Sequence, residues 1–143
     1  MADYQRILTA VDLNDQSAAV VAKAAELAAQ WHAALTLLHV VEFVPIEPMS
    51  DALVPVMQID DQIIRRAQEQ IHALARTVGL NEQCCRIATG NVKTEVLRLA
   101  RDSQADLILL GSRERHGLSI LVNLVEDTVL HGAPCDVLAV RVR

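Results

Sequence analysis

Short apolar runs alternate with longer amphipathic stretches from one end of the chain to the other, and this alternation is what most restricts its fold. Each run is apolar at nearly consecutive positions, as expected of a strand that is covered on both sides in a parallel sheet. We expect strands at residues 6–12, 35–41, 84–88, 106–111 and 136–141. The layers that cover such strands must come from the segments between them.

The segments between the runs have helical periodicity. Residues 18–31 are rich in Ala and lack Gly and Pro, and residues 59–78, 92–103 and 118–131 place apolar side chains at helical spacing. Five strands alternating with four helices indicate an α/β doubly wound fold with a parallel sheet, formed as a single domain by residues 1–143. In such sheets the crossovers are right-handed, and ligands bind beyond the carboxyl ends of the strands.

One stretch interrupts this alternation. Residues 42–58 contain Pro45, Pro48 and Pro55. Proline removes a backbone donor and disfavours helix in the residue before it. We therefore expect an irregular connection there, which covers a sheet edge, a pocket or a neighbouring chain.

Composition excludes several classes of function. The chain has 143 residues, of which 52% are hydrophobic, so it can build a core and is not intrinsically disordered. Aromatic residues make up 2% and the formal net charge is −5, which disfavours nucleic acid and acidic membranes as partners. The first residues carry neither a cationic leader nor a long apolar segment. We expect a cytoplasmic protein that binds neither nucleic acid nor membrane.

Nucleophilic and metal-binding residues form no recognisable catalytic pattern. Cys84, Cys85 and Cys135 lack C-x-x-C spacing, and neighbours in a strand point to opposite faces, which favours inert, buried thiols. The five histidines lack a second ligand at zinc-site spacing, and we expect His39 to pack inside the sheet. No residue is identifiable as a nucleophile or general base. The sequence therefore predicts a non-enzymatic protein without a metal.

A candidate ligand crevice lies beyond the first and fourth strands. Asp12 ends the first strand and Gly111 ends the fourth, and the cationic candidates that follow are Arg113, Arg115 and His116. Glycine permits close backbone approach, and exposed amides at a helix start can receive an anion. The alternative is that Gly111 only serves a turn and the arginines are solvated. Neither a Walker motif nor G-x-G-x-x-G is present, so no ordinary nucleotide phosphate site is predicted.

Four stretches together resemble the universal stress protein family over essentially the whole chain. They are residues 7–13, 37–40, 106–112 and 133–140. The resemblance implies a five-stranded fold of the adenine nucleotide alpha hydrolase-like type and a role in stress survival rather than catalysis. It also implies a cytoplasmic homodimer paired through the last strand, and the apolar residues there that we expect in the interface are Val137, Ala139 and Val140.

The ATP-binding branch of that family is recognised by Gly-x-x-Gly, a spacer, and then Gly followed by Ser or Thr. Gly111 matches the first glycine, but Glu114 stands at the second, and the later pair is replaced at residues 123–125 by Asn, Leu and Val. Glycines let phosphate oxygens approach backbone N–H groups, and the hydroxyl donates a further hydrogen bond. The resemblance therefore implies a degenerate phosphate site.

The nucleoside half of the family's site looks intact. Asp12 and Val40 match positions that hold adenine and ribose in the binding branch, with Leu110 and Gly111 beside them. The leading hypothesis is a stress-response homodimer without a cofactor or tight ATP binding, with a regulatory protein as a further candidate partner. The alternative is a sensor of ATP, ADP or AMP, in which Mg²⁺ accompanies a triphosphate and the basic residues after Gly111 replace the missing glycines. A slow ATPase or nucleotidyl transferase ranks third.

Overall fold

Five parallel strands form the sheet of this protein. The computed structural model describes residues 4–42, 61–112, 129 and 131–141. The strands are β1 (Arg6–Ala10), β2 (Ala34–Val41), β3 (Cys85–Thr89), β4 (Leu107–Ser112) and β5 (Asp136–Arg141), in the order β3-β2-β1-β4-β5. The chain winds outward from β1 to β3 and then resumes on the other side of β1, which is the doubly wound arrangement expected from the sequence.

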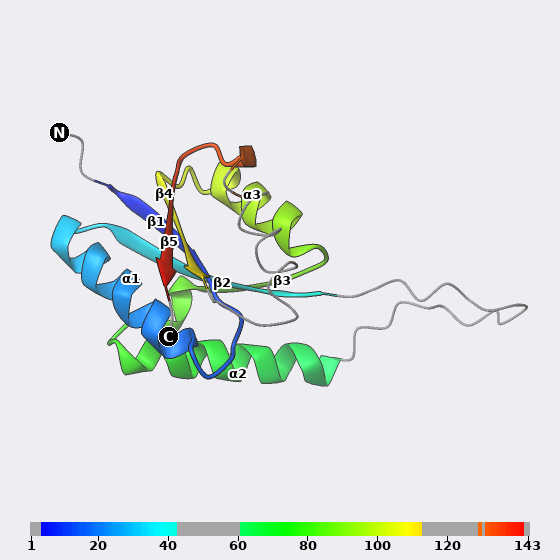
Figure 1. The fold of residues 1–143 in the computed structure, drawn as a ribbon. Helices are drawn as coiled ribbons and strands as arrows, with labels where there is room; N and C mark the ends of the chain where they lie inside the picture. The colour runs from blue at the N-terminus through cyan, green and yellow to red at the C-terminus, as the bar shows by residue number, and fades with distance from the viewer. Residues whose placement is uncertain (1–3, 43–60, 113–128, 130, 142–143) are drawn as a thin grey trace, which may run out of the picture.

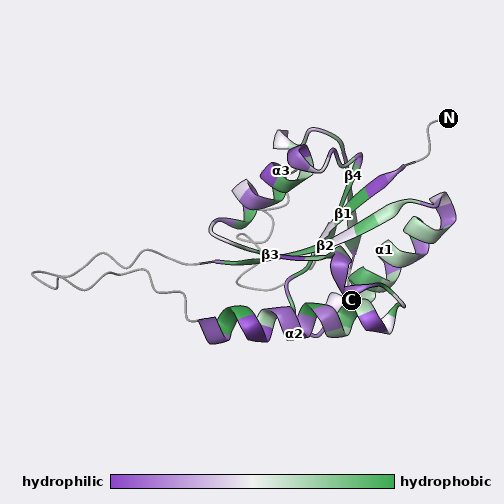
Figure 2. Cartoon of the chain, turned by 180° about the vertical axis from the view of Figure 1, so that it is seen from behind, coloured by the Kyte–Doolittle hydropathy of each residue, from purple (hydrophilic) through white to green (hydrophobic). Residues whose placement is uncertain are grey.

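Helices cover both faces of the sheet (Figure 1). The elements are α1 (Ser17–Trp31), α2 (Asp61–Thr77), the short 3-10 helix η1 (Glu82–Cys84) and α3 (Val92–Asp102). Helices α1 and α2 lie on one side, and α3 lies on the other. Hydrophobic and hydrophilic residues alternate along α2, as in an amphipathic helix with one face on the core (Figure 2).

Two hydrophobic clusters, one on each face, account for the continuous apolar runs. The first cluster joins Ile7, Leu37 and Leu109 of the sheet to Val21 of α1 and Ile71 of α2. The second joins the next residues along the same strands to α3, through Leu8, Leu38, Ile108, Val96 and Ala100. Consecutive strand residues thus enter opposite cores, because side chains alternate across a sheet. Full burial of each large side chain contributes about 1.5–3 kcal/mol.

The sequence predicted the order and type of these elements, with differences at the ends. β1 ends at Ala10, so Asp12 follows the strand instead of lying within it. The described residues form three α-helices rather than four. The expected helix at 118–131 falls mostly outside them, although residues 129, 131 and 132 have helical backbone. The irregular connection expected at 42–58 also lies outside the described residues, apart from Glu42.

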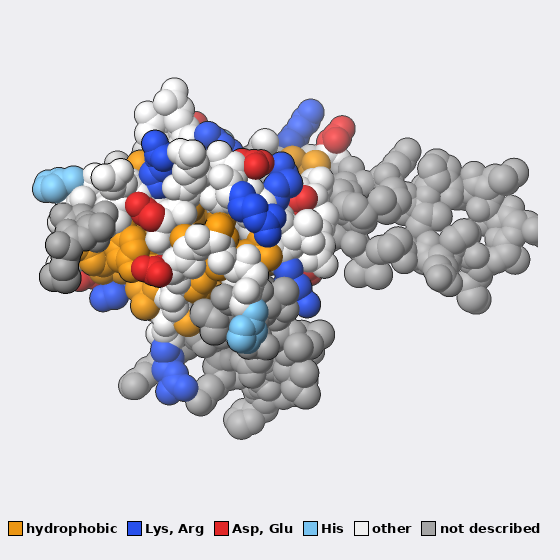
Figure 3. Space-filling model, turned by 90° about the horizontal axis from the view of Figure 1, so that it is seen from above, with side chains coloured by type: hydrophobic (Ala, Val, Ile, Leu, Met, Phe, Trp, Pro, Cys, Tyr) orange, Lys and Arg blue, Asp and Glu red, His pale blue; other side chains and the backbone are white. Residues whose placement is uncertain are grey.

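The end of the molecule that is uppermost in Figure 1 has an apolar centre. Seen from above, hydrophobic side chains gather in the middle of this end, and charged side chains lie around them (Figure 3).

None of the described helices is long and apolar enough to cross a lipid bilayer.

Candidate functional site

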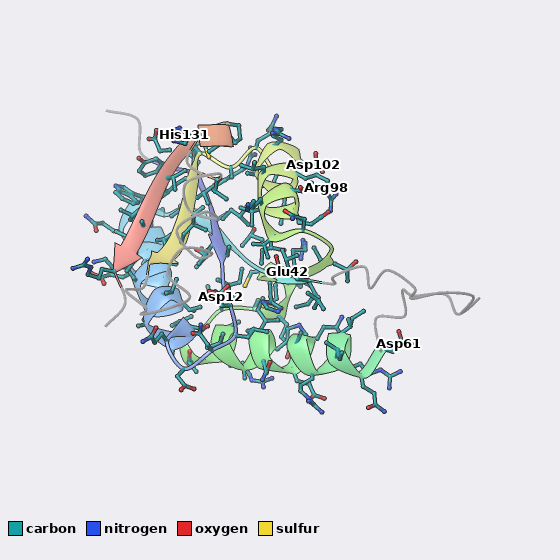
Figure 4. The ribbon with its side chains drawn as sticks, turned by 45° about the vertical axis from the view of Figure 1, so that its right-hand side comes forward. Asp12, Glu42, Asp61, Arg98, Asp102 and His131 are labelled. Atoms are coloured by element: carbon teal, nitrogen blue, oxygen red, sulfur yellow. The ribbon has the colours of Figure 1, made fainter. Side chains whose placement is uncertain are left out.

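A hollow of about 440 Å³ opens at the carboxyl ends of β1 and β2, against α2. It is lined by the residues after β1, the end of β2, one face of α2 and the start of α3, namely Asp12, Leu13, His39, Val40, Val41, Glu42, Ile63, Arg66, Ala67, Gln70 and Val92. Figure 4 shows Asp12 and Glu42 at the ends of their strands, both on the side of the sheet where α2 lies. The hollow thus occupies the edge at which α/β sheets bind ligands.

Two hydrogen bonds fix the position of Asp12 by tying Val11 to β2. The Val11 N–H donates to the Leu38 carbonyl at 2.8 Å, and the His39 ring nitrogen Nδ1 lies 2.7 Å from the Val11 carbonyl oxygen. Because a carbonyl only accepts, Nδ1 carries a hydrogen and donates it to Val11. Leu13 then takes a left-handed backbone conformation, with φ 58°, which turns the chain away from the strand.

The wall formed by α2 follows helical spacing. Ile63, Arg66, Ala67 and Gln70 stand at positions i, i+3, i+4 and i+7 and line the hollow together. Ala67 is also buried in the helix's packing face, with Ile71 one turn further along. Ile63 is 52% exposed, although it is a large apolar residue. The core side of α2 therefore anchors a mixed apolar and polar wall.

The charged groups of the hollow are two carboxylates and one guanidinium. Asp12 and Glu42 carry the carboxylates, and Arg66 carries the guanidinium. Among the described residues, the side chains of Asp12, Glu42, Arg66 and Gln70 make no hydrogen bond or ion pair. Within this part of the chain no group of three or more His, Cys, Asp or Glu residues could hold a metal ion. These polar groups are therefore available to a small organic ligand.

The structure places two of the predicted site residues in the hollow and two on the neighbouring strand β4, where Leu110 pairs with Ala10 of β1. Asp12 and Val40 line the same hollow. Leu110 is 6% exposed in the second cluster, and Gly111 pairs with Val140 of β5, and neither lines the hollow. The cationic candidates Arg113, Arg115 and His116 lie outside the described residues.

His39 corrects one expectation, because its ring is half-buried at the hollow instead of packed inside the sheet. His39 is the third residue from the end of β2, where a side chain can leave the core. The other residues that the sequence analysis missed are Glu42, Ile63, Arg66 and Gln70. Arg66 and Gln70 flank the apolar stripe of α2, but only the docking of α2 beside β2 brings them into the same hollow as Asp12.

The residues expected in a dimer interface lie on an edge strand. Among the described residues β5 pairs only with β4. Val137 packs against the second cluster and Val140 against the first, whereas Ala139 is exposed. Leu138 is 37% exposed. This edge therefore presents apolar side chains, and no second strand of the described residues pairs with it.

The three cysteines are free thiols. All three are half-buried, and burial is the main cause that raises the pKa of Cys85 to about 12 and also raises the pKa of Cys135. Cys84 and Cys85 both pack against the first cluster, contrary to the expectation of opposite faces. The reason is that Cys84 ends η1 and does not belong to β3.

Comparison with known proteins agrees with this architecture. The model of the universal stress protein family matches residues 3–141. The chain belongs to the universal stress protein family. Universal stress protein A homolog 2 of Coxiella burnetii is 33% identical over 144 residues, covering 100% of this chain and 99% of the relative. Homolog 1 of the same organism is 35% identical over 138 residues and 96% of both chains.

Solved universal stress proteins have the same fold. The protein UspA from Lactobacillus plantarum superposes with a TM-score of 0.77 at 24% identity, over 99% of this chain and 100% of its own. A universal stress protein in complex with cAMP superposes with a TM-score of 0.69 at 22% identity, over 97% of this chain and 98% of its own. The membership supports a stress-response role for the present universal stress protein.

Proposed function

We propose that this universal stress protein is a non-catalytic, cytoplasmic stress-response protein that acts as a homodimer and does not hold ATP tightly. The observation that carries the proposal is the charge of the described hollow, where two carboxylates face one guanidinium. The glycines and hydroxyl of the family's phosphate motif are also replaced, at Glu114 and at residues 123–125. A carboxylate about 5 Å from one phosphate charge costs roughly 3 kcal/mol at an effective dielectric near 20, which is about a hundredfold in affinity.

Isothermal titration calorimetry tests this proposal directly. ATP, ADP and AMP are titrated with Mg²⁺ into protein that has been freed of nucleotide by unfolding and refolding. We expect no saturable binding of ATP at micromolar concentration and no thermal stabilisation at millimolar ATP. Replacing Glu114 and Leu124 by Gly and Val125 by Ser should then raise ATP affinity. Tight ATP binding by the unmodified chain would overturn the proposal.

The position of β5, an edge strand among the described residues, supports the homodimer. An apolar edge strand is stabilised by pairing with a second copy, which satisfies its backbone groups and covers Leu138 and Ala139. We expect a dimer in light scattering at micromolar concentration. Leu138→Asp should shift it toward monomer, whereas the control Thr89→Asp, an exposed position on the opposite edge strand, should leave it dimeric. A wild-type monomer would contradict this part of the proposal.

A nucleotide sensor is the second candidate function. It is favoured by the meeting of Asp12 and Val40 in one hollow and by the cAMP that a structural neighbour carries. In this case the calorimetric titration should show saturable micromolar binding of at least one adenine nucleotide. Asp12→Ala should then abolish the heat while leaving the dimer intact.

A further inference from the structure

We infer that Cys84 and Cys85 form a dithiol site that binds a trivalent arsenical, with one sulfur–arsenic bond from each residue. The pair lies where η1 ends and β3 begins. Neither cysteine lines the hollow at the carboxyl ends of β1 and β2. The site is therefore separate from the one discussed above, and the inference does not depend on whether a nucleotide binds.

The end of η1 places two consecutive thiols on one side of the sheet. Within a regular strand, neighbouring side chains point to opposite faces. Cys84 is the last residue of η1 and Cys85 is the first of β3, and with this change of backbone geometry both side chains pack against the first cluster. The two thiols thus share one environment, which a longer β3 would have divided between the two faces.

The sulfur atoms are close enough to bind one ligand together. Burial, the charge of Cys84 and a hydrogen bond with the Cys84 thiol, in that order of size, raise the pKa of Cys85 to about 12. This hydrogen bond puts the two side chains in direct contact. The Cys85 Sγ also lies 3.7 Å from the carbonyl oxygen of Ile71 in α2. Both cysteines are half-buried rather than fully enclosed, so the pair remains open to a small reagent.

Backbone hydrogen bonds hold the two cysteines in place before a ligand arrives. The Cys84 N–H donates to the Asn81 carbonyl at 3.0 Å, and the Cys85 N–H donates to the Glu82 carbonyl. Cys85 also pairs with Leu37 of β2. A ligand that needs two sulfur atoms therefore finds them already together, which lowers the entropic cost of binding.

The chemistry of the pair favours an arsenical over a soft metal cation. A cation binds thiolates and displaces their protons, so the raised pKa of Cys85 opposes it. Arsenous acid, As(OH)₃, instead exchanges two As–O bonds for two As–S bonds. Each thiol proton leaves with a hydroxyl group as water, and the third hydroxyl stays on arsenic. Arsenic remains trivalent and sulfur remains reduced, so the step needs no oxidant and releases no net proton.

Phenylarsine oxide tests the inference on the intact chain, kept reduced with a phosphine. Mass spectrometry of the protein should show one phenylarsenic group per chain, formed with loss of one water. Ethanedithiol should remove this group, whereas the same concentration of 2-mercaptoethanol should not, and sodium arsenite should compete for the site. Ellman's reagent should then find only Cys135 free to react.

Single substitutions separate the pair from the remaining thiol. Because linked groups raise each other's effective concentration, Cys84→Ser and Cys85→Ser should each weaken binding at least a hundredfold. The matched control is Cys135→Ser, which removes a half-buried free thiol that packs against the second cluster, and it should bind as the wild type does. Circular dichroism checks that each variant is folded. If Cys85→Ser does not fold, Cys84→Ser decides the result.

The dependence on pH tests the choice of an arsenical. The dissociation constant of phenylarsine oxide should change less than threefold between about pH 6.5 and pH 8, whereas any binding of Cd²⁺ should tighten as pH rises. Tighter binding of Cd²⁺ than of phenylarsine oxide at neutral pH would overturn this choice. The absence of an adduct on the wild type, an adduct that Cys135→Ser removes, or equal binding by Cys84→Ser and the wild type would overturn the site itself.

Discussion

The two ends of the sheet use the same kinds of polar residue in opposite ways. At the amino ends of the strands, the Asp106 carboxylate accepts the backbone N–H groups of Gln5 and Arg6 at 2.8 and 2.9 Å. At the carboxyl ends, the carboxylates of Asp12 and Glu42 have no such partner among the described residues. At the amino ends the Asp106 carboxylate stabilises the fold, whereas at the carboxyl ends the carboxylates line a hollow.

This difference between the two ends predicts that the carboxylate at the amino ends contributes to stability and the carboxylates at the carboxyl ends contribute to binding. A carboxylate that accepts backbone N–H groups joins segments distant in sequence, as Asp106 joins the start of β4 to the start of β1. A carboxylate without a protein partner is hydrated and contributes little to folding, but it can exchange water for a ligand hydroxyl. Substitutions at the two ends should therefore change different measured quantities.

The largest effect is expected from Asp106→Ala. Loss of two hydrogen bonds to a charged acceptor should lower the free energy of unfolding by about 2–3 kcal/mol, measured by urea denaturation at a fixed protein concentration. Asp102→Ala is the control, because Asp102 is exposed and makes only a 3.6 Å ion pair with Arg98. Its effect should stay below about 0.5 kcal/mol. Equal effects of the two substitutions would remove the distinction between structural and surface carboxylates.

A smaller effect is expected from Tyr4→Phe. The Tyr4 hydroxyl donates to Asp136 Oδ2 at 2.7 Å, and its loss should cost about 1 kcal/mol, while the edge-to-face contact with Trp31 can be retained by Phe. Urea denaturation of the wild type and the variant measures the difference.

This difference should also depend on pH. The hydrogen bond to Asp136 raises the pKa of Tyr4 above its usual value, so the unfolded chain loses the phenolic proton first. The stabilisation is therefore complete below about pH 10, the ordinary pKa of tyrosine, and is lost as pH rises through the folded-state pKa. A wild-type advantage that stays constant between pH 8 and 11 would contradict the structural role of this bond.

The smallest effect on stability is expected at the opposite end. Asp12→Ala should change the free energy of unfolding by less than about 0.5 kcal/mol, because an exposed carboxylate without a partner contributes little. If the wild type binds an adenine nucleotide, the same variant should lose that binding at least tenfold in calorimetry. Destabilisation of the size expected for Asp106→Ala would show that both ends of the sheet serve the fold.

Much of the site could be predicted because parallel strands end at a common edge. The order of elements placed Asp12 and Gly111 at one edge of the sheet, and the resemblance to the universal stress protein family added Val40 and Leu110. The hollow contains Asp12 and Val40, whereas Leu110, which pairs with Ala10 of β1, is buried in the second cluster. Position in sequence indicates the edge, but it does not say which side chains at that edge remain uncovered.

The local sequence by itself determined the strands, the helices and the two-sided burial of the sheet, because apolar periodicity and chain stiffness act over neighbouring residues. Only the tertiary structure decided that Arg66 and Gln70 line one hollow with Asp12, that His39 binds the Val11 carbonyl, and that Cys84 and Cys85 share one core. These relations join residues that are distant in sequence or depend on where an element ends. They arise from how elements dock, and docking energy is spread over many side chains rather than recorded in a local pattern.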